Sequence, residues 1–205
     1  MFRKEANIYL IRHGETDWNR SGRLQGLTDV PLNRTGIVQA IEIGHCLRRR
    51  AMGCVFTSPL RRASDTARLL RGSRRWPVIA DDELREIDHG VWTGLEVSEI
   101  ARRLPDDYRC WQSAPEKLRL KRADSVEGAY HRVGAFLSRV MGVARKVDVA
   151  VVSHGVLNGL MVCAAMGFPL GRMGDFPVPN ASICVLQIRH GQIDGLKGLE
   201  NATHR

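Results

Sequence analysis

The chain has 205 residues, 43% of them apolar, with 31 basic and 22 acidic residues and a net charge of +9. This composition is typical of a folded domain and excludes a largely disordered chain. No apolar run approaches the roughly 20 residues that cross a bilayer. The apolar block after Lys4 is also shorter than the roughly 7 to 15 residues of a signal-peptide core. We therefore expect no membrane contact, no secretion signal and a cytoplasmic location.

The spacing of cysteine and histidine gives no sign of a metal site. Five cysteines are widely separated, and neither they nor the seven histidines show paired ligand spacing. We expect reduced thiols and no metal. The basic excess attracts anions of any kind, so phosphorylated small molecules and nucleic acid are both candidates. No recognition-helix pattern or aromatic-rich strand supports nucleic acid.

Apolar runs predict strands, in chain order, at residues 8–11, 54–57, 78–80 and 149–152, and an edge hairpin at 183–188 and 193–196. The continuous runs are typical of parallel strands buried on both faces. Helical spacing predicts helices after Asn33, after Pro59, over 126–143 and over 156–166. Asp124 and Glu127 match a capping box for the third of these. The alternation predicts an α/β three-layer sandwich whose mostly parallel central sheet is flanked by helices.

Polar motifs directly follow three of these strands. Arg12 and His13 come after the first, Arg61 soon after the second, and His154 after the fourth. Ligands of open α/β sheets bind beyond the carboxyl ends of the strands, so these side chains are expected to converge. Guanidinium groups match phosphate oxygens, and a neutral histidine nitrogen is a nucleophile near pH 7. The pattern therefore indicates phosphoryl chemistry.

These motifs resemble those of the histidine phosphatase superfamily, which includes cofactor-dependent phosphoglycerate mutases and fructose-2,6-bisphosphatases. The resemblance runs from about residue 8 to residue 182 and implies a single domain of this family over residues 1–205. It is carried by these runs: Arg12-His13-Gly14-Glu15-Thr16 with Trp18-Asn19, Leu24-Gln25-Gly26, Ser58-Pro59-Leu60-Arg61-Arg62-Ala63, Leu84-Arg85-Glu86-Ile87-Asp88, Ser153-His154-Gly155 and Asn180-Ala181-Ser182.

The resemblance also implies a role for each matching residue. His13 would be the nucleophile, and Glu86 would protonate the leaving oxygen. Arg12, Arg61 and a positively charged His154 would grip the phosphoryl oxygens. Further contacts to phosphate or substrate would come from Asn19, Gln25, Gly26 and Gly155. The arginines would supply the positive charge that a metal otherwise gives, so no cofactor is expected.

The reaction is expected to be hydrolysis of a small phosphorylated metabolite. The run after Glu86, from Ile87 to Leu95, resembles the phosphatase branch, and residues 104–111 resemble the lid of small phosphatases in this group. A phosphoglycerate mutase and a non-catalytic phospho-ligand binder are the alternatives. The basic stretch from Lys117 to Arg122 is either a solvated loop or a rim that recruits charged substrates. A homodimer is possible on this sequence.

Overall fold

The structure, a computed structural model, describes residues 5–144, 147–176 and 178–201. A six-stranded sheet in the order β3-β2-β4-β1-β5-β6 lies at its centre. The first four strands in this order run parallel, and β5 and β6 run antiparallel to their neighbours. The strands are β1 (Glu5–Arg12), β2 (Met52–Thr57), β3 (Val78–Ala80), β4 (Asp148–Ser153), β5 (Ser182–Arg189) and β6 (Gln192–Asn201).

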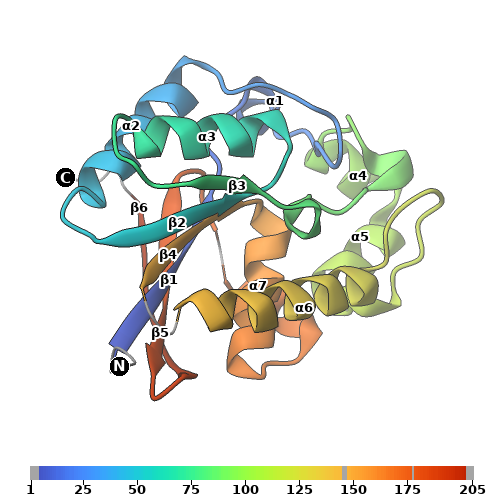
Figure 1. The fold of residues 1–205 in the computed structure, drawn as a ribbon. Helices are drawn as coiled ribbons and strands as arrows, with labels where there is room; N and C mark the ends of the chain where they lie inside the picture. Colours follow the sequence, from blue (N-terminus) through green and yellow to red (C-terminus); the bar gives the residue numbers. More distant parts are fainter. Residues whose placement is uncertain (1–4, 145–146, 177, 202–205) are drawn as a thin grey trace.

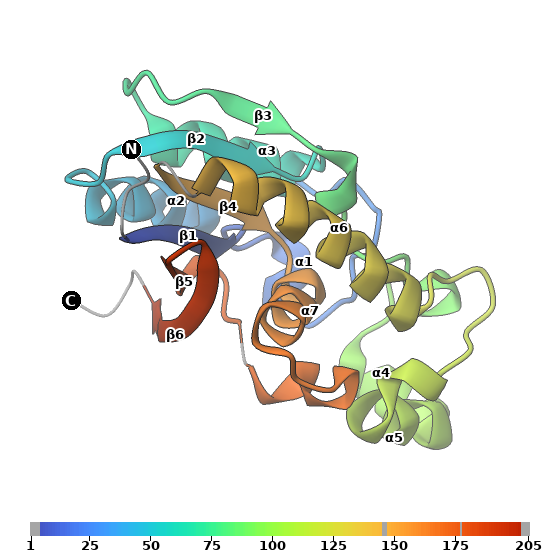
Figure 2. The same cartoon turned by 60° about the horizontal axis from the view of Figure 1, so that its bottom comes forward.

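Helices cover both faces of the sheet, with α2 and α3 on one side and α6 and α7 on the other (Figure 1). Figure 2 shows α4 and α5 together at one end of the molecule, beside the first turns of α6. The helices are α1 (Asp17–Arg20), α2 (Arg34–Cys46), α3 (Arg61–Arg71), α4 (Val97–Arg103), α5 (Pro105–Ser113), α6 (Val126–Ala144) and α7 (Gly155–Met166). Short 3₁₀ turns are η1 (Asp82–Leu84), η2 (Gly90–Trp92), η3 (Pro115–Lys117) and η4 (Leu170–Asp175).

The core has two halves because successive side chains of a strand point to opposite faces of the sheet. On β1, Ile8 and Leu10 pack toward α6 and α7, whereas Tyr9 and Ile11 pack toward α2 and α3. Each fully buried Ile, Leu, Val or Phe contributes about 1.5–3 kcal/mol. The predicted three-layer α/β sandwich is confirmed, and the strands predicted at residues 8–11, 54–57 and 149–152 are neighbours in one sheet.

One local expectation needs correction, and two short helices were not predicted. Ser125, and not Asp124, caps α6, because its Oγ accepts from the Gly128 amide at 3.0 Å. Asp124 instead accepts from the Asp88 amide at 3.0 Å, so its side chain is not the cap that the predicted capping box with Glu127 requires. The short helices α1 and α4 have too few turns for a periodic apolar signal. Helix α1 depends on a capping box between Thr16 and Asn19.

The three central parallel strands end level with one another. Arg12 pairs with Ser153, and Thr57 pairs with Val152. The next residue of each strand is therefore brought to one edge of the sheet, and these residues are His13, Ser58 and His154. No helix in the described part of the chain is long and apolar enough to cross a membrane.

Candidate active site

A cavity of about 580 Å³ opens at this edge of the sheet. Its polar base is formed by Arg12, His13, Arg62, Glu86 and Asn19. Helix α5, which the sequence placed in a lid, contributes Tyr108 and Trp111 to the cavity wall. Most of the predicted site residues therefore meet in one place, although two of them lie elsewhere.

One ring nitrogen of His13 has no hydrogen-bond partner among the described residues. Its Nδ1 lies 2.7 Å from the Gly14 carbonyl oxygen, and a carbonyl only accepts, so Nδ1 carries the proton. The lone pair of Nε2 is then available. Burial, followed by the charges of Arg62 and Arg12, lowers the pKa of His13 well below 6.5. His13 is therefore neutral at neutral pH, as a nitrogen nucleophile must be.

The backbone beside His13 is held by very close packing. The Gly14 amide donates to Thr66 Oγ1 at 3.0 Å. A Cβ on Gly14 would lie 2.4 Å from the Gly36 carbonyl oxygen, and a Cβ on Gly36 would lie 2.1 Å from the Glu15 carbonyl oxygen. The start of α2 and the loop after β1 can approach this closely only because both positions are glycine.

Arg61 does not line the cavity, which corrects the expectation from sequence. Its side chain is 62% exposed and faces Asp65 at 3.7 Å. The arginine of the cavity is Arg62, which is 1% exposed and donates to the Thr28 and Gly26 carbonyls at 2.7 and 2.8 Å. Burial, the largest cause, lowers the pKa of Arg62 to about 10, so it stays positive at neutral pH.

The spacing of residues along α3 indicates which of the two arginines faces the interior. The buried positions of the helix include Arg62, Ala63, Thr66, Ala67 and Leu70, at three- and four-residue intervals. Such intervals place residues on the same helix face. The helix phase therefore puts Arg62 on the face of Thr66, toward the sheet.

His154 is buried behind His13 and is not part of the cavity lining. Its Nδ1 accepts from Arg62 Nε at 3.2 Å, so the proton is on Nε2, which donates to Ser58 Oγ at 2.8 Å. Burial and then the charge of Arg62 lower the pKa of His154 well below 6.5. The expectation of a charged His154 is therefore wrong for this structure, because Arg62 already supplies a cation next to a fully buried ring.

The rings of the two histidines are in contact. Their centroids lie 5.2 Å apart in an edge-to-face arrangement. His154 consequently supports the ring of His13 and the guanidinium of Arg62 from behind.

Arg12 lies at the end of β1 with its guanidinium under the start of α7. Its Nη1 donates to the Val178 carbonyl at 2.6 Å, and its buried Nε has no hydrogen-bond partner among the described residues. Gly155 leaves room for this group, since a Cβ there would lie 3.4 Å from Arg12 Cζ. Burial lowers the pKa of Arg12 and Glu86 raises it, and the guanidinium remains charged at neutral pH.

Glu86 places a carboxyl group in the same cavity. Its Oε1 accepts from the Ile87 amide at 3.1 Å and its Oε2 from the Val156 amide at 3.4 Å. The side chain is 8% exposed. Glu86 is thus oriented by two backbone amides and is accessible from the cavity. It can act as an acid or a base beside Arg12 and Arg62.

Asn19 is oriented by three contacts to its Oδ1. These come from the amide and hydroxyl of Thr16 at 3.1 and 2.9 Å and from Asn180 Nδ2 at 3.2 Å. Its Nδ2 has no acceptor in the described part of the chain and is left as a donor for the cavity. The sequence did not assign a role to Asn180, whose Nδ2 also donates to the His13 carbonyl at 3.1 Å.

Gln25 and Gly26 both line the cavity, as expected. The buried Gln25 Oε1 has no hydrogen-bond partner in the described structure. Gly26 has φ of +50° and supplies a carbonyl to Arg62. Gly155 lies in the lining at the first residue of α7, where helix amides face anions.

The chain combines a neutral histidine nitrogen, the guanidinium groups of buried Arg62 and half-buried Arg12, and a carboxyl group at the edge of an α/β sheet. These are the groups that an enzyme needs to bind and transfer a phosphoryl group. A family model of the histidine phosphatase superfamily (branch 1) matches residues 8–198, and the chain belongs to this superfamily. Among the described residues, no group of three or more His, Cys, Asp or Glu side chains is placed to hold a metal ion.

The relatives include proteins named as phosphatases and one named as a probable phosphoglycerate mutase. Phosphoserine phosphatase 1 of Hydrogenobacter thermophilus is 36% identical over 183 residues, covering 89% of this chain and 87% of that protein. The Proteus mirabilis protein named "Probable phosphoglycerate mutase GpmB" is 32% identical over 181 residues, covering 86% and 82%. The crystal structure of the alpha-ribazole phosphatase from Shigella flexneri has a TM-score of 0.81 and 27% identity, covering 91% and 92%.

Proposed function

We propose that this protein hydrolyses small phosphomonoesters through a phosphohistidine formed on Nε2 of His13. The observation that carries the proposal is the free Nε2 lone pair of a buried, neutral histidine whose Nδ1 proton is held by the Gly14 carbonyl. Phosphomonoester hydrolysis is among the slowest reactions in water, with enzymatic accelerations up to about 10²¹. The site must therefore stabilise charge strongly in the transition state.

In the first step, Nε2 attacks phosphorus, the N–P bond forms and the bond to the alcohol oxygen breaks. Arg12 and Arg62 neutralise charge on the equatorial oxygens, with Asn19 and the Gly155 amide at the start of α7 as further donors. Glu86 gives its proton to the leaving oxygen. General acid catalysis of this kind typically raises the rate 10²–10⁴-fold.

In the second step, a water molecule attacks phosphorus from the side that the alcohol has left. Glu86 takes a proton from this water, the N–P bond breaks and inorganic phosphate is released. His13 returns to its neutral form and Glu86 to its protonated form. The cycle needs no group beyond those that line the cavity.

The experiment traps the intermediate. The protein is mixed with a ³²P-labelled monoester and quenched in alkaline detergent, and labelled peptides are mapped. We expect an acid-labile, base-stable label on the peptide that contains His13. His13→Ala should abolish both labelling and turnover, whereas the matched change His45→Ala, at an exposed position near the end of α2, should leave both intact. Full activity of His13→Ala, or a label only on the His154 peptide, would contradict the mechanism.

A mutase would use the same intermediate but return the phosphoryl group to a second hydroxyl group. The similarity to a protein named as a phosphoglycerate mutase supports testing this reaction. Phosphate release and isomerisation of 3-phosphoglycerate should be measured in the same sample. We expect release to exceed isomerisation, and the reverse result would favour the mutase.

A further inference from the structure

We infer that the alcohol part of the substrate is an apolar group bearing a ring, with no second anionic group. This inference rests on the proposed function and concerns the part of the cavity beyond the phosphoryl site. Two independent features support it, namely the pairing of the charged side chains there and the aromatic character of the wall.

Beyond the phosphoryl site, the charged side chains in the described cavity lining are already paired. Arg23 Nη2 lies 2.8 Å from Glu96 Oε1, and its Nη1 donates to the Gly94 carbonyl at 2.9 Å. Asp175 accepts from Arg172 Nε at 2.8 Å. Both pairs are about half-exposed, with side-chain exposures of 40% and 41% for Arg23 and Glu96 and of 50% and 54% for Arg172 and Asp175. A substrate carboxylate would have to compete with Glu96 for Arg23, and an ammonium group would have to compete with Arg172 for Asp175, so a second charge gains little there.

The arginine that pairs with Asp175 is itself held in place. The Arg172 guanidinium lies over the Phe168 ring at 4.7 Å and the Phe176 ring at 5.9 Å, and these two rings are stacked on each other. Such cation–π contacts favour one arrangement of the guanidinium. These contacts thus hold the Arg172 guanidinium beside Asp175, although both side chains are about half-exposed.

Aromatic rings form much of the remaining wall. Trp111 of α5 contacts His89 with a centroid separation of 5.8 Å and Trp92 with 6.3 Å, both edge-to-face. Burial is the largest cause that lowers the pKa of His89, so this ring is neutral as well. Tyr108 and Phe176 lie in the same lining. Aromatic walls bind flat or apolar groups by stacking and by exclusion of water.

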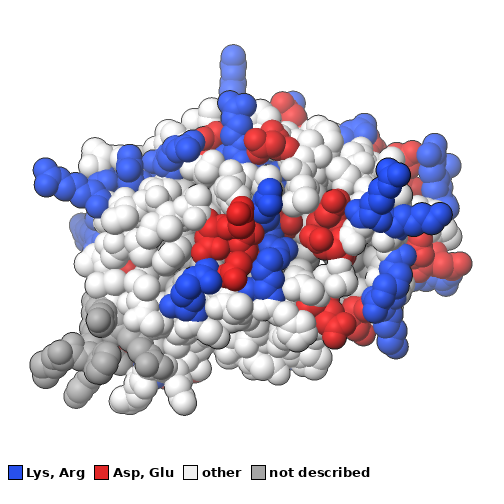
Figure 3. Space-filling view, turned by 45° about the vertical axis from the view of Figure 1, so that its right-hand side comes forward, with Lys and Arg blue, Asp and Glu red and all other residues white. Residues whose placement is uncertain are grey.

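The exposed basic stretch from Lys117 to Arg122 adds no charged side chain to the cavity lining. Lys117, Arg119, Lys121 and Arg122 are all exposed and none is part of the cavity lining. Figure 3 shows basic and acidic side chains interspersed on the face of the molecule that carries α4 and α5. The cavity interior therefore decides which alcohol is accepted.

The test uses primary alkyl phosphates, which share one kind of leaving group and differ in what it carries. The set is ethyl phosphate, 2-phenylethyl phosphate, O-phosphoserine and 3-phosphoglycerate. We expect kcat/KM for 2-phenylethyl phosphate to exceed that for ethyl phosphate by roughly tenfold or more, in line with stacking strengths. The two carboxylate substrates should not exceed ethyl phosphate. Faster turnover of either carboxylate substrate than of 2-phenylethyl phosphate would overturn the inference.

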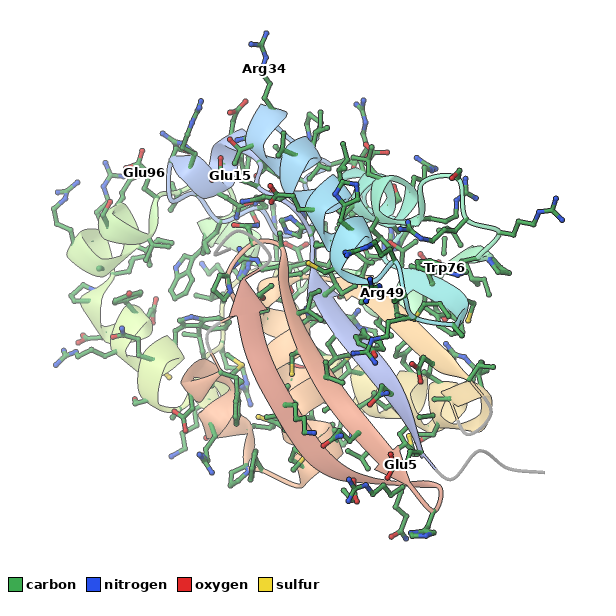
Figure 4. All side chains as sticks on the ribbon, turned by 90° about the vertical axis from the view of Figure 1, so that its left-hand side faces the viewer. Glu5, Glu15, Arg34, Arg49, Trp76 and Glu96 are labelled. Atoms are coloured by element: carbon green, nitrogen blue, oxygen red, sulfur yellow. The ribbon has the colours of Figure 1, made fainter. Side chains whose placement is uncertain are left out.

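Variants then test whether the aromatic wall at Trp111 causes the preference for a ring-bearing substrate. Trp111→Ala should reduce the ratio of the phenylethyl to the ethyl substrate to near one, and Trp111→Phe should keep most of it. Trp76→Ala is the matched control, since Figure 4 shows Trp76 on the opposite side of the molecule from Glu96 and α4, and Trp76 contacts Arg74. Because each ratio is measured within one protein sample, a loss of folded protein cancels. An unchanged ratio in Trp111→Ala would contradict the inference.

Releasing the paired arginine tests the charge argument separately. Glu96→Gln removes the carboxylate from Arg23 and should raise kcat/KM for 3-phosphoglycerate by about fivefold relative to ethyl phosphate, a change of about 1 kcal/mol. No selective gain would count against the charge argument. If the wild-type protein hydrolyses ethyl phosphate through His13 without a ring preference, only this inference fails. If no monoester is hydrolysed, the proposed function fails.

Discussion

Arg62 Nε donates to His154 Nδ1 at 3.2 Å, so a buried arginine determines the tautomer of a buried histidine. The proton of His154 is thereby directed to Ser58 Oγ on the strand-end loop of β2. Next to this contact, Arg62 carries the positive charge and the ring of His154 stays neutral. The positive charge at the phosphoryl position comes from Arg12 and Arg62, and both histidines are neutral.

The first prediction distinguishes two adjacent arginines. Arg62→Ala should lower kcat/KM for p-nitrophenyl phosphate by roughly 10²–10³-fold, because it removes a donor to the transferring group and leaves His154 Nδ1 unpaired. Arg61→Ala should change it by less than about twofold, since this exposed side chain makes only a weak surface pair with Asp65. Circular dichroism checks that both variants fold. Equal losses in the two variants would mean that the geometry at the start of α3 is wrong.

The second prediction concerns protonation. Because the pKa values of His13 and His154 are lowered well below 6.5, both rings should stay neutral at pH 6.5 and titrate only in more acidic solution. Nitrogen-detected NMR of the imidazole rings measures this directly, with the exposed His45 as the internal reference. Half-protonation of either buried ring at or above pH 6.5 would contradict the hydrogen-bond assignment.

The same shifts make stability depend on pH with a defined sign. The unfolded chain binds protons at histidine below about pH 6.5, whereas the folded protein does not until the pH is much lower. The stabilising contribution of these rings is therefore fully present above pH 6.5 and is lost as the pH falls toward their folded-state values. The urea concentration at the midpoint of unfolding should be lower at pH 5 than at pH 7.5. This difference should be smaller in His13→Ala.

The third prediction tests the acid. Glu86→Gln should reduce turnover of ethyl phosphate by about 10²–10⁴-fold and turnover of p-nitrophenyl phosphate much less, because only the poor leaving group needs a proton. Glu83→Gln is the matched control, as that carboxylate pairs with Arg139 outside the cavity lining. Equal losses on both substrates would remove Glu86 from the role of proton donor.

The fourth prediction concerns the glycine contact that supports His13. Gly36→Ala places a Cβ 2.1 Å from the Glu15 carbonyl oxygen, which is backbone that cannot move aside cheaply. We expect a loss of about 1–3 kcal/mol in the free energy of unfolding and lower activity, because the His13–Gly14 loop must shift. Gly134→Ala in α6 meets no atom within 4 Å and should stabilise the protein by about 0.5–1 kcal/mol. Chemical denaturation of both variants provides the measurement, and a neutral Gly36→Ala would refute the close approach.

Much of this protein can be predicted from its sequence because the relevant signals are local. Continuous apolar runs identify the parallel strands, and His13 follows one of them within a motif of a few adjacent positions. Glu86 lies in another short motif, which resembles that of the superfamily. Even the choice between Arg61 and Arg62 depends on helix spacing, because 62 and 66 lie on one face of α3. Local order along the chain therefore determined the α/β class and the superfamily.

Other features depend on residues that only folding brings together. Ser58 and His154 are 96 positions apart, and Asn19 and Asn180 are 161 apart, yet each pair is hydrogen-bonded. The neutral state of His154 follows from burial and from a neighbouring guanidinium, and neither can be derived from the motif in which it occurs. Hydrogen-bond direction and desolvation depend on the positions of all surrounding atoms. The tertiary structure therefore decided which groups carry charge and which wall faces the substrate.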